Sequence, residues 1–316
     1  MTIMNIARSL LRFLVMLGAA SILIFVLLRA VPGDPARIAL GVTASDEDVA
    51  KLAAQLGTDR PLVVQYLDWM RGLLTGDFGV SLASKQDITP LVWDRVQVSL
   101  ILTVSAMVLS LLIAIPVGTY LARRNRKADA AVVSALTQVG IAVPSFLVGI
   151  LAVAVFSVWL GWLPANGWVP PNADFGGFVA HLVLPVVALT LVQAAILTRY
   201  VRSALLEEMG KDYVRTARAV GLSTRKVLYR HALRNAALPV LTVTGLQLTS
   251  LIVGAVVIER VFAIPGIGSM LLDAVATRDL TTVQTLMMLL VVFTLAVTLL
   301  VDVLYRIIDP RLRRQA

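Results

Sequence analysis

The amino-acid sequence predicts an all-α membrane protein with six transmembrane helices. Of its 316 residues, 58% are hydrophobic and only 15% are charged, and the mean hydropathy is +0.86. Soluble globular domains contain about 45–50% apolar and about 25% charged residues, so this chain is too apolar for that class. The apolar residues also form stretches of the length that crosses a bilayer, about 20 residues of helix. A disordered chain is excluded, because disorder requires low hydrophobicity.

Six apolar stretches are expected to be the membrane spans. The third is too long for one straight span, so we expect it to tilt or to begin outside the hydrocarbon core. Pro116, Pro144 and Pro185 fall inside spans, where each removes a backbone donor and predicts a kink supported by neighbouring helices. The stretches are 10–30, 97–121, 130–160, 179–200, 236–258 and 281–305.

The basic residues predict how these spans are oriented, since cytoplasmic loops carry an excess of Lys and Arg. Nineteen of the 28 basic residues lie in the N-terminal segment, the loop 123–127, the stretch 199–234 and the C-terminal tail. With six spans, these four segments fall on one side of the membrane, so both termini are expected in the cytoplasm. The net charge of +9 is then a signal of topology, and no nucleic-acid partner is expected.

Side chains suited to catalysis are scarce. The sequence has no cysteine, and its two histidines, His181 and His231, are far apart in the chain. Cysteine nucleophiles and metal sites built from cysteine or histidine are therefore not expected. The Gly-x-x-x-x-Gly-Lys-Ser/Thr loop that holds nucleotide phosphates is also missing from the sequence. We expect no cofactor in this chain and no enzymatic activity of its own.

Two other classes of membrane protein fit the sequence less well. A secondary transporter would need ion-coupling acids near the middle of the membrane or an inverted repeat. The spans carry acidic residues only near their ends, and no repeat is visible. A membrane-embedded protease or transferase would need a nucleophile and a base, and neither histidine has an obvious partner within a span.

The loop 31–96 is too long for a simple connector and carries its own helix signals. Ser45 precedes an acidic run, which predicts the start of a helix that ends at Gly57. A second helix is expected to begin at Pro61, with Asp59 or Thr58 as its cap, and to end near Gly76. The loop is thus expected to be a small helical insertion on the outer surface. Two roles stay open: a packing lid, or a docking surface for an external partner.

The segment 201–235 is the most informative part of the sequence. It lies between two spans on the basic side, and 203–220 is expected to be helical. Gly221 fits the left-handed position after a helix, and Ser223 can cap a second helix over 224–235.

Three interpretations of this segment compete. It could be a loop that is basic only because cytoplasmic loops carry an excess of Lys and Arg. It could also be a helix-turn-helix that binds DNA, or a coupling element that a cytoplasmic motor subunit binds. The DNA-binding interpretation is disfavoured, because both ends of the segment are tied to spans and a third supporting helix is missing.

The coupling interpretation is strengthened by a resemblance. Residues 213–223 read YVRTARAVGLS, and residues 230–235 read RHALRN. Together they resemble the EAA loop of the membrane subunits of ATP-binding-cassette (ABC) importers, which docks in a groove of the ATPase subunit. The family pattern is Glu-Ala-Ala, three residues, Gly, and Leu-Pro further on. Here the glutamate is absent, Leu233 is followed by Arg234, and a proline comes only at Pro239. These departures match the dipeptide/oligopeptide/nickel branch.

Other stretches are similar to the first-listed permease of the same branch, in matching order along nearly the whole chain. They are VPGDP at 31–35, LG at 56–57 with DRP at 59–61, GDFG at 76–79, ERVF at 259–262, IPGIG at 264–268 and DPR at 309–311.

The resemblance implies a type I ABC importer permease, with one permease domain over 1–316. Family members pair with a second homologous permease, bind two ATPase subunits that hold ATP and Mg²⁺, and receive solute from an extracytoplasmic binding protein. Transport then proceeds by alternating access across the plasma membrane of a bacterium or archaeon. The expected solute is a dipeptide or oligopeptide, and nickel chelates or oligosaccharides stay open as alternatives.

Three groups of site residues are expected. The ATPase contact would use Tyr213, Thr216, Ala217, Gly221, Leu222 and Ser223. Polar side chains inside spans are costly unless they face the bundle or water, so a second group either lines the solute pathway or bonds between helices. This group is Thr190, Gln193, Thr244, Gln247 and Ser250. Glu259 and Arg260, at the outer end of the fifth span, are expected at an outer gate, a binding-protein contact or a subunit interface.

Overall fold

A computed structural model describes residues 3–30, 35–41 and 43–308 of the chain. Within these residues, five helices are long and apolar enough to cross a membrane, and one bent pair of helices meets the same criteria when its parts are taken together. They correspond to the six predicted spans, the third being the bent pair. The sequence motifs at 31–35 and 309–311 lie almost wholly outside the described residues. The five single helices are Arg8–Arg29, Thr89–Arg123, Phe175–Met209, Thr224–Val261 and Leu280–Tyr305.

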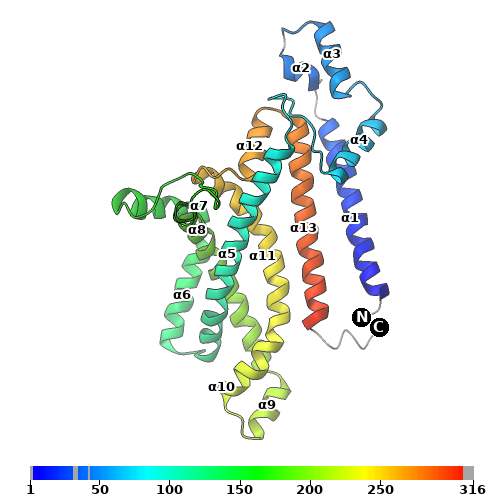
Figure 1. The fold of residues 1–316 in the computed structure, drawn as a ribbon. Coiled ribbons are helices and arrows are strands. Elements are labelled where there is room, and N and C mark those ends of the chain that lie inside the picture. The colour runs from blue at the N-terminus through cyan, green and yellow to red at the C-terminus, as the bar shows by residue number, and fades with distance from the viewer. Residues whose placement is uncertain (1–2, 31–34, 42, 309–316) are drawn as a thin grey trace. The chain divides into compact units, whose positions relative to one another are not determined.

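The chain divides into two compact units. Unit 1 consists mainly of Ser99–Pro265, and unit 2 consists of Ile6–Val98 and Gly266–Ala296. Figure 1 labels the α-helices of the chain. In chain order the helices are α1 (Ile3–Arg29), α2 (Pro35–Leu40), α3 (Asp46–Leu56), α4 (Leu62–Thr75), α5 (Thr89–Arg123), α6 (Ala128–Ala142), α7 (Ser145–Ala152), the π-helical η1 (Val153–Trp159), α8 (Phe175–Met209), α9 (Asp212–Ala219), α10 (Thr224–Val227), the π-helical η2 (Leu228–Ala232), α11 (Leu233–Val261), α12 (Ile267–Ala276) and α13 (Leu280–Ile308).

The third predicted span is broken rather than tilted. Its two parts, α6 and the run of α7 and η1, meet at an angle of 97°. Val143 at the break is extended, with ψ of 124°, because the ring of Pro144 disfavours a helical conformation in the residue before it. The kink expected at this proline is therefore confirmed in a stronger form. Helices α5 and α8, in contrast, continue without interruption through Pro116 and Pro185.

Small residues allow the helices of unit 1 to approach closely. A Cβ added to Gly118 of α5 would lie 2.7 Å from Val201 of α8, and one added to Gly245 of α11 would lie 2.4 Å from Val301 of α13. Helix packing in membranes relies on such small residues, since lipid offers little hydrophobic drive for association. Helix α8 also packs against α6, α7 and α11, so it is central to this unit.

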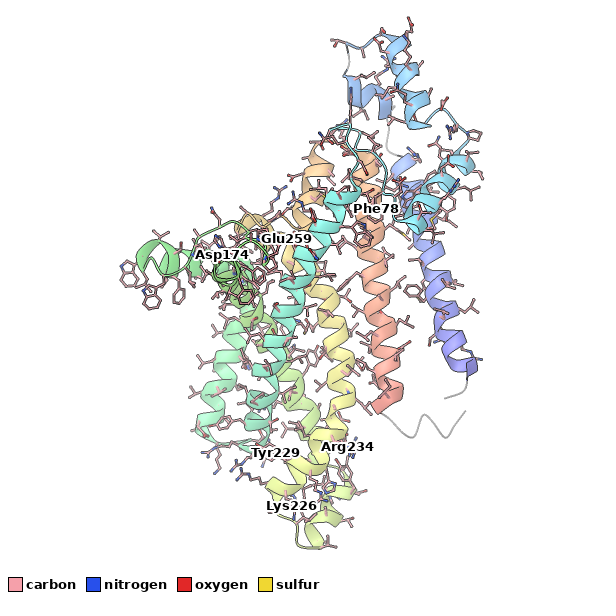
Figure 2. All side chains as sticks on the ribbon, in the orientation of Figure 1. Phe78, Asp174, Lys226, Tyr229, Arg234 and Glu259 are labelled. Carbon is pink, nitrogen blue, oxygen red and sulfur yellow. The ribbon has the colours of Figure 1, made fainter. Side chains whose placement is uncertain are left out.

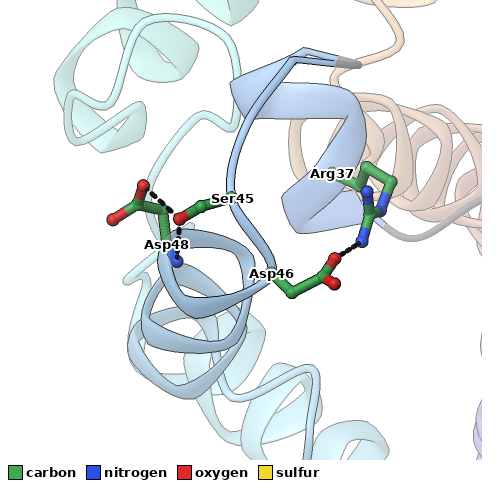
Figure 3. Close-up of polar contacts among 4 residues, drawn as sticks. All are labelled: Arg37, Ser45, Asp46 and Asp48. Carbon is green, nitrogen blue, oxygen red and sulfur yellow. Dashed lines mark hydrogen bonds and ion pairs between the residues drawn. The ribbon is translucent and has the colours of Figure 1, made fainter.

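The long loop of unit 2 contains the two predicted helices. Ser45 caps α3, since its hydroxyl accepts a hydrogen bond from the backbone N–H of Asp48 at 3.2 Å and donates to the carboxylate of that residue (Figure 3). An ion pair between Arg37 and Asp46 joins α2 to the start of α3, as the same view shows. Gly57 ends α3 in the left-handed conformation, as the sequence predicted.

Helix α4 ends at the predicted glycine but lacks the predicted cap. Gly76 follows it in the left-handed conformation, whereas Pro61 occupies the N-cap position without a side-chain hydrogen bond. The hydroxyl of Thr58 donates instead to the carbonyl of Ala53, at the end of α3. The expectation that Asp59 or Thr58 caps α4 is thus wrong, because the α3–α4 turn uses that hydroxyl to close the preceding helix.

Two sequence motifs of the family meet in the core of unit 2. Phe78 of the 76–79 motif is buried with Ile267 and Met270 of α12 and with Leu286 of α13. Beside this core, the buried carboxylate of Asp279 accepts four hydrogen bonds from groups on two segments. The donors are the hydroxyl of Ser81 at 2.5 Å, the backbone N–H of Leu82 at 3.1 Å, and the backbone N–H and hydroxyl of Thr282 at 3.3 Å and 2.7 Å.

Replacing Asp279 with alanine is expected to destabilise unit 2 by about 3 kcal/mol, because four buried donors lose a charged acceptor. The midpoint of thermal unfolding of the purified chain measures the loss. Asp94→Ala removes an exposed carboxylate from the same unit and should leave the midpoint nearly unchanged. Equal midpoints for the two variants would contradict this role of Asp279.

Candidate functional site

The segment between α8 and α11 forms a short helix pair at one end of unit 1 (Figure 1). The sequence predicted one helix over 203–220, and this is wrong. Helix α8 ends at Met209 and α9 begins at Asp212, because Lys211 between them is extended, with ψ of 155°. The second predicted helix is present, but it is π-helical from Leu228 to Ala232 and continues directly into α11. No loop therefore separates α10 from the fifth span.

A buried carboxylate holds the turn between α8 and α9. Glu208 is 7% exposed and accepts a hydrogen bond from the phenol of Tyr213 at 2.8 Å. It also pairs with the ammonium of Lys211. The hydrogen bond to Glu208 raises the pKa of Lys211, and burial raises the pKa of the Tyr213 phenol. The raised pKa of Lys211 has the sign expected for an ammonium that pairs with a carboxylate.

The turn between α9 and α10 has the predicted geometry. Gly221 has φ of +91°, a conformation that glycine adopts without steric strain. The hydroxyl of Ser223 accepts a hydrogen bond from the backbone N–H of Lys226 at 3.4 Å, which caps α10. Val214 of α9 and Val227 of α10 are fully buried, so each helix of the pair places an apolar side chain away from solvent.

Most of the residues expected in the ATPase contact are accessible. Thr216, Gly221 and Ser223 are exposed, and Ala217 and Leu222 are half-buried. Tyr213 is different, since its hydroxyl points inward to Glu208 and supports the turn from within. Between these residues, the apolar side chain of Val220 is 74% exposed and forms part of the same accessible face.

Sequence reasoning missed a hollow on α10 and η2. It has a volume of about 470 Å³ and is lined by Ser223, Arg225, Lys226, Tyr229 and Arg230. Figure 2 shows Lys226 and Tyr229 at the same end of unit 1 as Arg234. The available signal in the sequence was a tyrosine among basic residues, whereas its exposure is seen only in the structure. A partner surface that entered the hollow would contact the ring of Tyr229 and the basic side chains that surround it.

The polar residues expected along the pathway mostly bond to other helices or to their own. The amide of Gln193 on α8 donates to Gln247 on α11 at 2.9 Å. Thr190 donates to the carbonyl of Ala106 on α5 at 3.3 Å, and Thr244 donates to a carbonyl one turn earlier in α11. Ser250 is exposed. These contacts connect α8 to α5 and α11 near the middle of their apolar stretches.

Glu259 and Arg260 are adjacent in sequence but differ in environment. Glu259, labelled in Figure 2, is 1% exposed and accepts a hydrogen bond from the hydroxyl of Ser99 on α5 at 2.5 Å. Arg260 is exposed. In this conformation the carboxylate of Glu259 is not accessible to a docking protein, whereas the side chain of Arg260 is. In the part of the chain that the structure covers, no group of three potential ligands could hold a metal ion.

Two family descriptions match the chain and together span nearly all of it. Residues 114–314 match the binding-protein-dependent transport system inner membrane component, and residues 2–103 match the N-terminal part of a membrane component of such systems. The chain belongs to this permease family. The resemblance to ABC importer permeases is thereby confirmed, and the chain is a multi-pass membrane protein. Such a permease is not itself catalytic, because ATP hydrolysis belongs to a separate subunit.

Several relatives match this permease over nearly their full length. A chain of Brucella abortus (strain 2308) named for a peptide transport system permease is 43% identical over 298 residues, 93% of both chains. The oligopeptide transport system permease protein AppB of Bacillus subtilis (strain 168) is 36% identical over 310 residues, 97% of this chain and 98% of that one.

Solved structures support the fold of the permease. A chain of the inward-facing MetNI methionine ABC transporter matches with a TM-score of 0.58 at 20% identity, over 70% of this chain and 98% of that chain. A chain of an amino acid ABC transporter matches with a TM-score of 0.54 at 16% identity, over 69% and 94%. The expected architecture of an ABC importer permease is therefore confirmed.

Proposed function

We propose that this permease imports peptides, driven by two ATPase subunits that grip the segment 210–235. The observation that carries the proposal is the exposed turn of α9 and α10, held on α8 by Glu208 and continuous with α11. The names of the relatives, which refer to peptide and oligopeptide transport, support the choice of solute. A second homologous permease would complete the pathway, and an extracytoplasmic binding protein would deliver the peptide.

The geometry suggests how a movement of the ATPases would reach the membrane. A displacement of α10 passes through η2 into α11 without a flexible loop. A displacement of α9 passes to α8 through Glu208 and Tyr213. Gln193 and Gln247 join α8 to α11 within the membrane. A movement of these two helices relative to each other would open or close the pathway by alternating access.

The proposal fixes an orientation. The segment 210–235 and both termini would lie in the cytoplasm, and the insertion 31–96 would face the binding protein outside a bacterial or archaeal plasma membrane. ATP and Mg²⁺ would be held by the partner subunits. The exposed Arg260 would lie on the outer side, and the buried Glu259 would act in an outer gate.

The test is reconstitution of the assembly in lipid, with ATP hydrolysis and uptake of labelled dipeptides measured with and without the binding protein. Ala217→Arg places a long cation in the contact face, so we expect the ATPase subunits to be lost from the purified assembly. Ser203→Arg adds the same side chain to an exposed site on α8 and should leave the assembly intact. If Ala217→Arg retained both the ATPases and stimulation, the segment would not be the motor contact.

A further inference from the structure

A basic cavity lies in unit 1, beside the connection between α5 and α6. Its volume is about 660 Å³. Three basic side chains line it, from Arg126, Lys127 and Arg202, together with Asn125, Ser134 and Gln138. Alanines of α6 form the rest of the wall, and their small side chains leave the space open. The lining contains no acidic residue among those the structure describes, so the cavity attracts anions.

Arg202 is the central cation of this cavity. It is half-buried, and it donates to the hydroxyl of Ser134 at 3.3 Å and to the side-chain carbonyl of Asn125 at 3.2 Å. Both acceptors are neutral, and its buried Nε has no hydrogen-bond partner within the described residues. The nearby carboxylate of Asp129 is engaged by Arg124 at 2.6 Å. A cation partly removed from water is stabilised by an anion, and here the described residues supply none.

The cavity lies beside the residues at which the apolar runs of two spans end. The apolar run of α5 ends at Ala122, directly before Arg123, and that of α8 ends at Thr198, before Arg199 and Arg202. Basic residues at such boundaries lie among lipid headgroups. A bound anion at this level is therefore within reach of the bilayer.

An apolar stripe runs along α6 next to the cavity. Ala131, Ala135 and Gln138 line the cavity, and the adjacent residues on the helix surface are Val132, Leu136 and Val139. These three side chains are 61%, 65% and 60% exposed. A molecule with an anionic head and apolar chains would satisfy the cavity and the stripe together, whereas a free phosphate would satisfy only the cavity.

We propose that this cavity binds the headgroup of an anionic phospholipid, with its acyl chains along Val132, Leu136 and Val139. The planar guanidinium of Arg202 suits a phosphate oxygen pair, and Arg126 and Lys127 add charge at the rim. The site is separate from the coupling segment, so it binds lipid whatever solute the permease transports.

The test uses the full-length chain, delipidated in detergent, with binding measured by native mass spectrometry. The probes are phosphatidylglycerol, the zwitterionic phosphatidylcholine and soluble glycerol 3-phosphate. Phosphatidylglycerol should bind the wild-type chain, and the other two should bind at least tenfold more weakly. One basic residue near a membrane surface changes affinity about fivefold, so R202Q should weaken binding about fivefold and the double variant R126Q/K127Q about twenty-fivefold.

The matched control is R123Q, which removes an exposed cation from the end of α5 outside the cavity. It should leave binding unchanged. The double variant, whose residues are exposed, keeps the test valid if R202Q fails to fold. The proposal is overturned if R123Q weakens binding as much as the cavity variants, if phosphatidylcholine binds equally well, or if glycerol 3-phosphate competes at equal concentration.

Discussion

Replacing Gly221 with proline is expected to lower the ATP hydrolysis that the binding protein stimulates by about tenfold or more, while the chain remains folded in the membrane. Gly221 has φ of +91°, and proline fixes φ near −65°. The substitution therefore forces the α9–α10 turn into another shape. Strain of this kind is worth about 1–3 kcal/mol, so stimulated hydrolysis should fall about tenfold or more. Stimulated and basal ATPase activity of the reconstituted assembly measure the effect.

Gly161→Pro provides the matched control. Gly161 also has a left-handed conformation, with φ of +65°, and like Gly221 it has no atom within 4 Å of an added Cβ. It lies just beyond η1, outside the segment 210–235. We expect this variant to retain stimulation. Equal loss of activity in the two variants would mean that backbone strain anywhere in unit 1 disables the permease, and the coupling role of the turn would lose its support.

Replacing Glu208 with alanine should separate ATPase docking from transport. Tyr213 and Lys211 both lose their buried acceptor, so α9 is no longer fixed to the end of α8. Thr216, Gly221 and Ser223 stay exposed, and the ATPase subunits should still copurify. A hydrogen bond to a charged group is worth about 1.5–3 kcal/mol, so peptide uptake per ATP hydrolysed should fall about tenfold or more.

The ratio of uptake to hydrolysis distinguishes this result from simple misfolding. Glu208→Gln keeps an oxygen for Tyr213 and should recover part of the coupling. Glu207→Ala removes the exposed carboxylate of the preceding residue and should change little. If Glu208→Ala lost its ATPase subunits altogether, the carboxylate would serve docking, and the path from α9 to α8 would not be the route of coupling.

The features that were predictable from the sequence are those with local causes. The spans were predictable from the length of the apolar stretches. The helix ends at Ser45, Gly57 and Gly221 depend on residues within one turn of the chain. The three prolines within predicted spans show the limit of such reasoning. Pro144 ends a helix and Pro116 and Pro185 do not, because neighbouring helices determine whether the lost hydrogen bond is tolerated.

The break between α8 and α9 was missed for a similar reason. Residues 203–220 have the composition of one helix, but in the structure Lys211 is extended and Glu208 is buried with two partners that follow it. Periodicity does not report such side-chain contacts. The accessible face of the turn was predictable, because Gly221 and Ser223 define it. The inward position of Tyr213 and the exposed Tyr229 depend on packing and needed the structure.

The bond between Gln193 and Gln247 joins two side chains that carry no net charge. Moving a charge through a membrane potential of 100 mV changes its energy by about 2.3 kcal/mol, whereas a neutral amide carries no such charge. The contact between α8 and α11 is therefore insensitive to voltage and to the proton gradient. At this contact, the membrane potential would neither assist nor oppose a movement of α8 relative to α11, as the proposed drive by ATPase subunits requires.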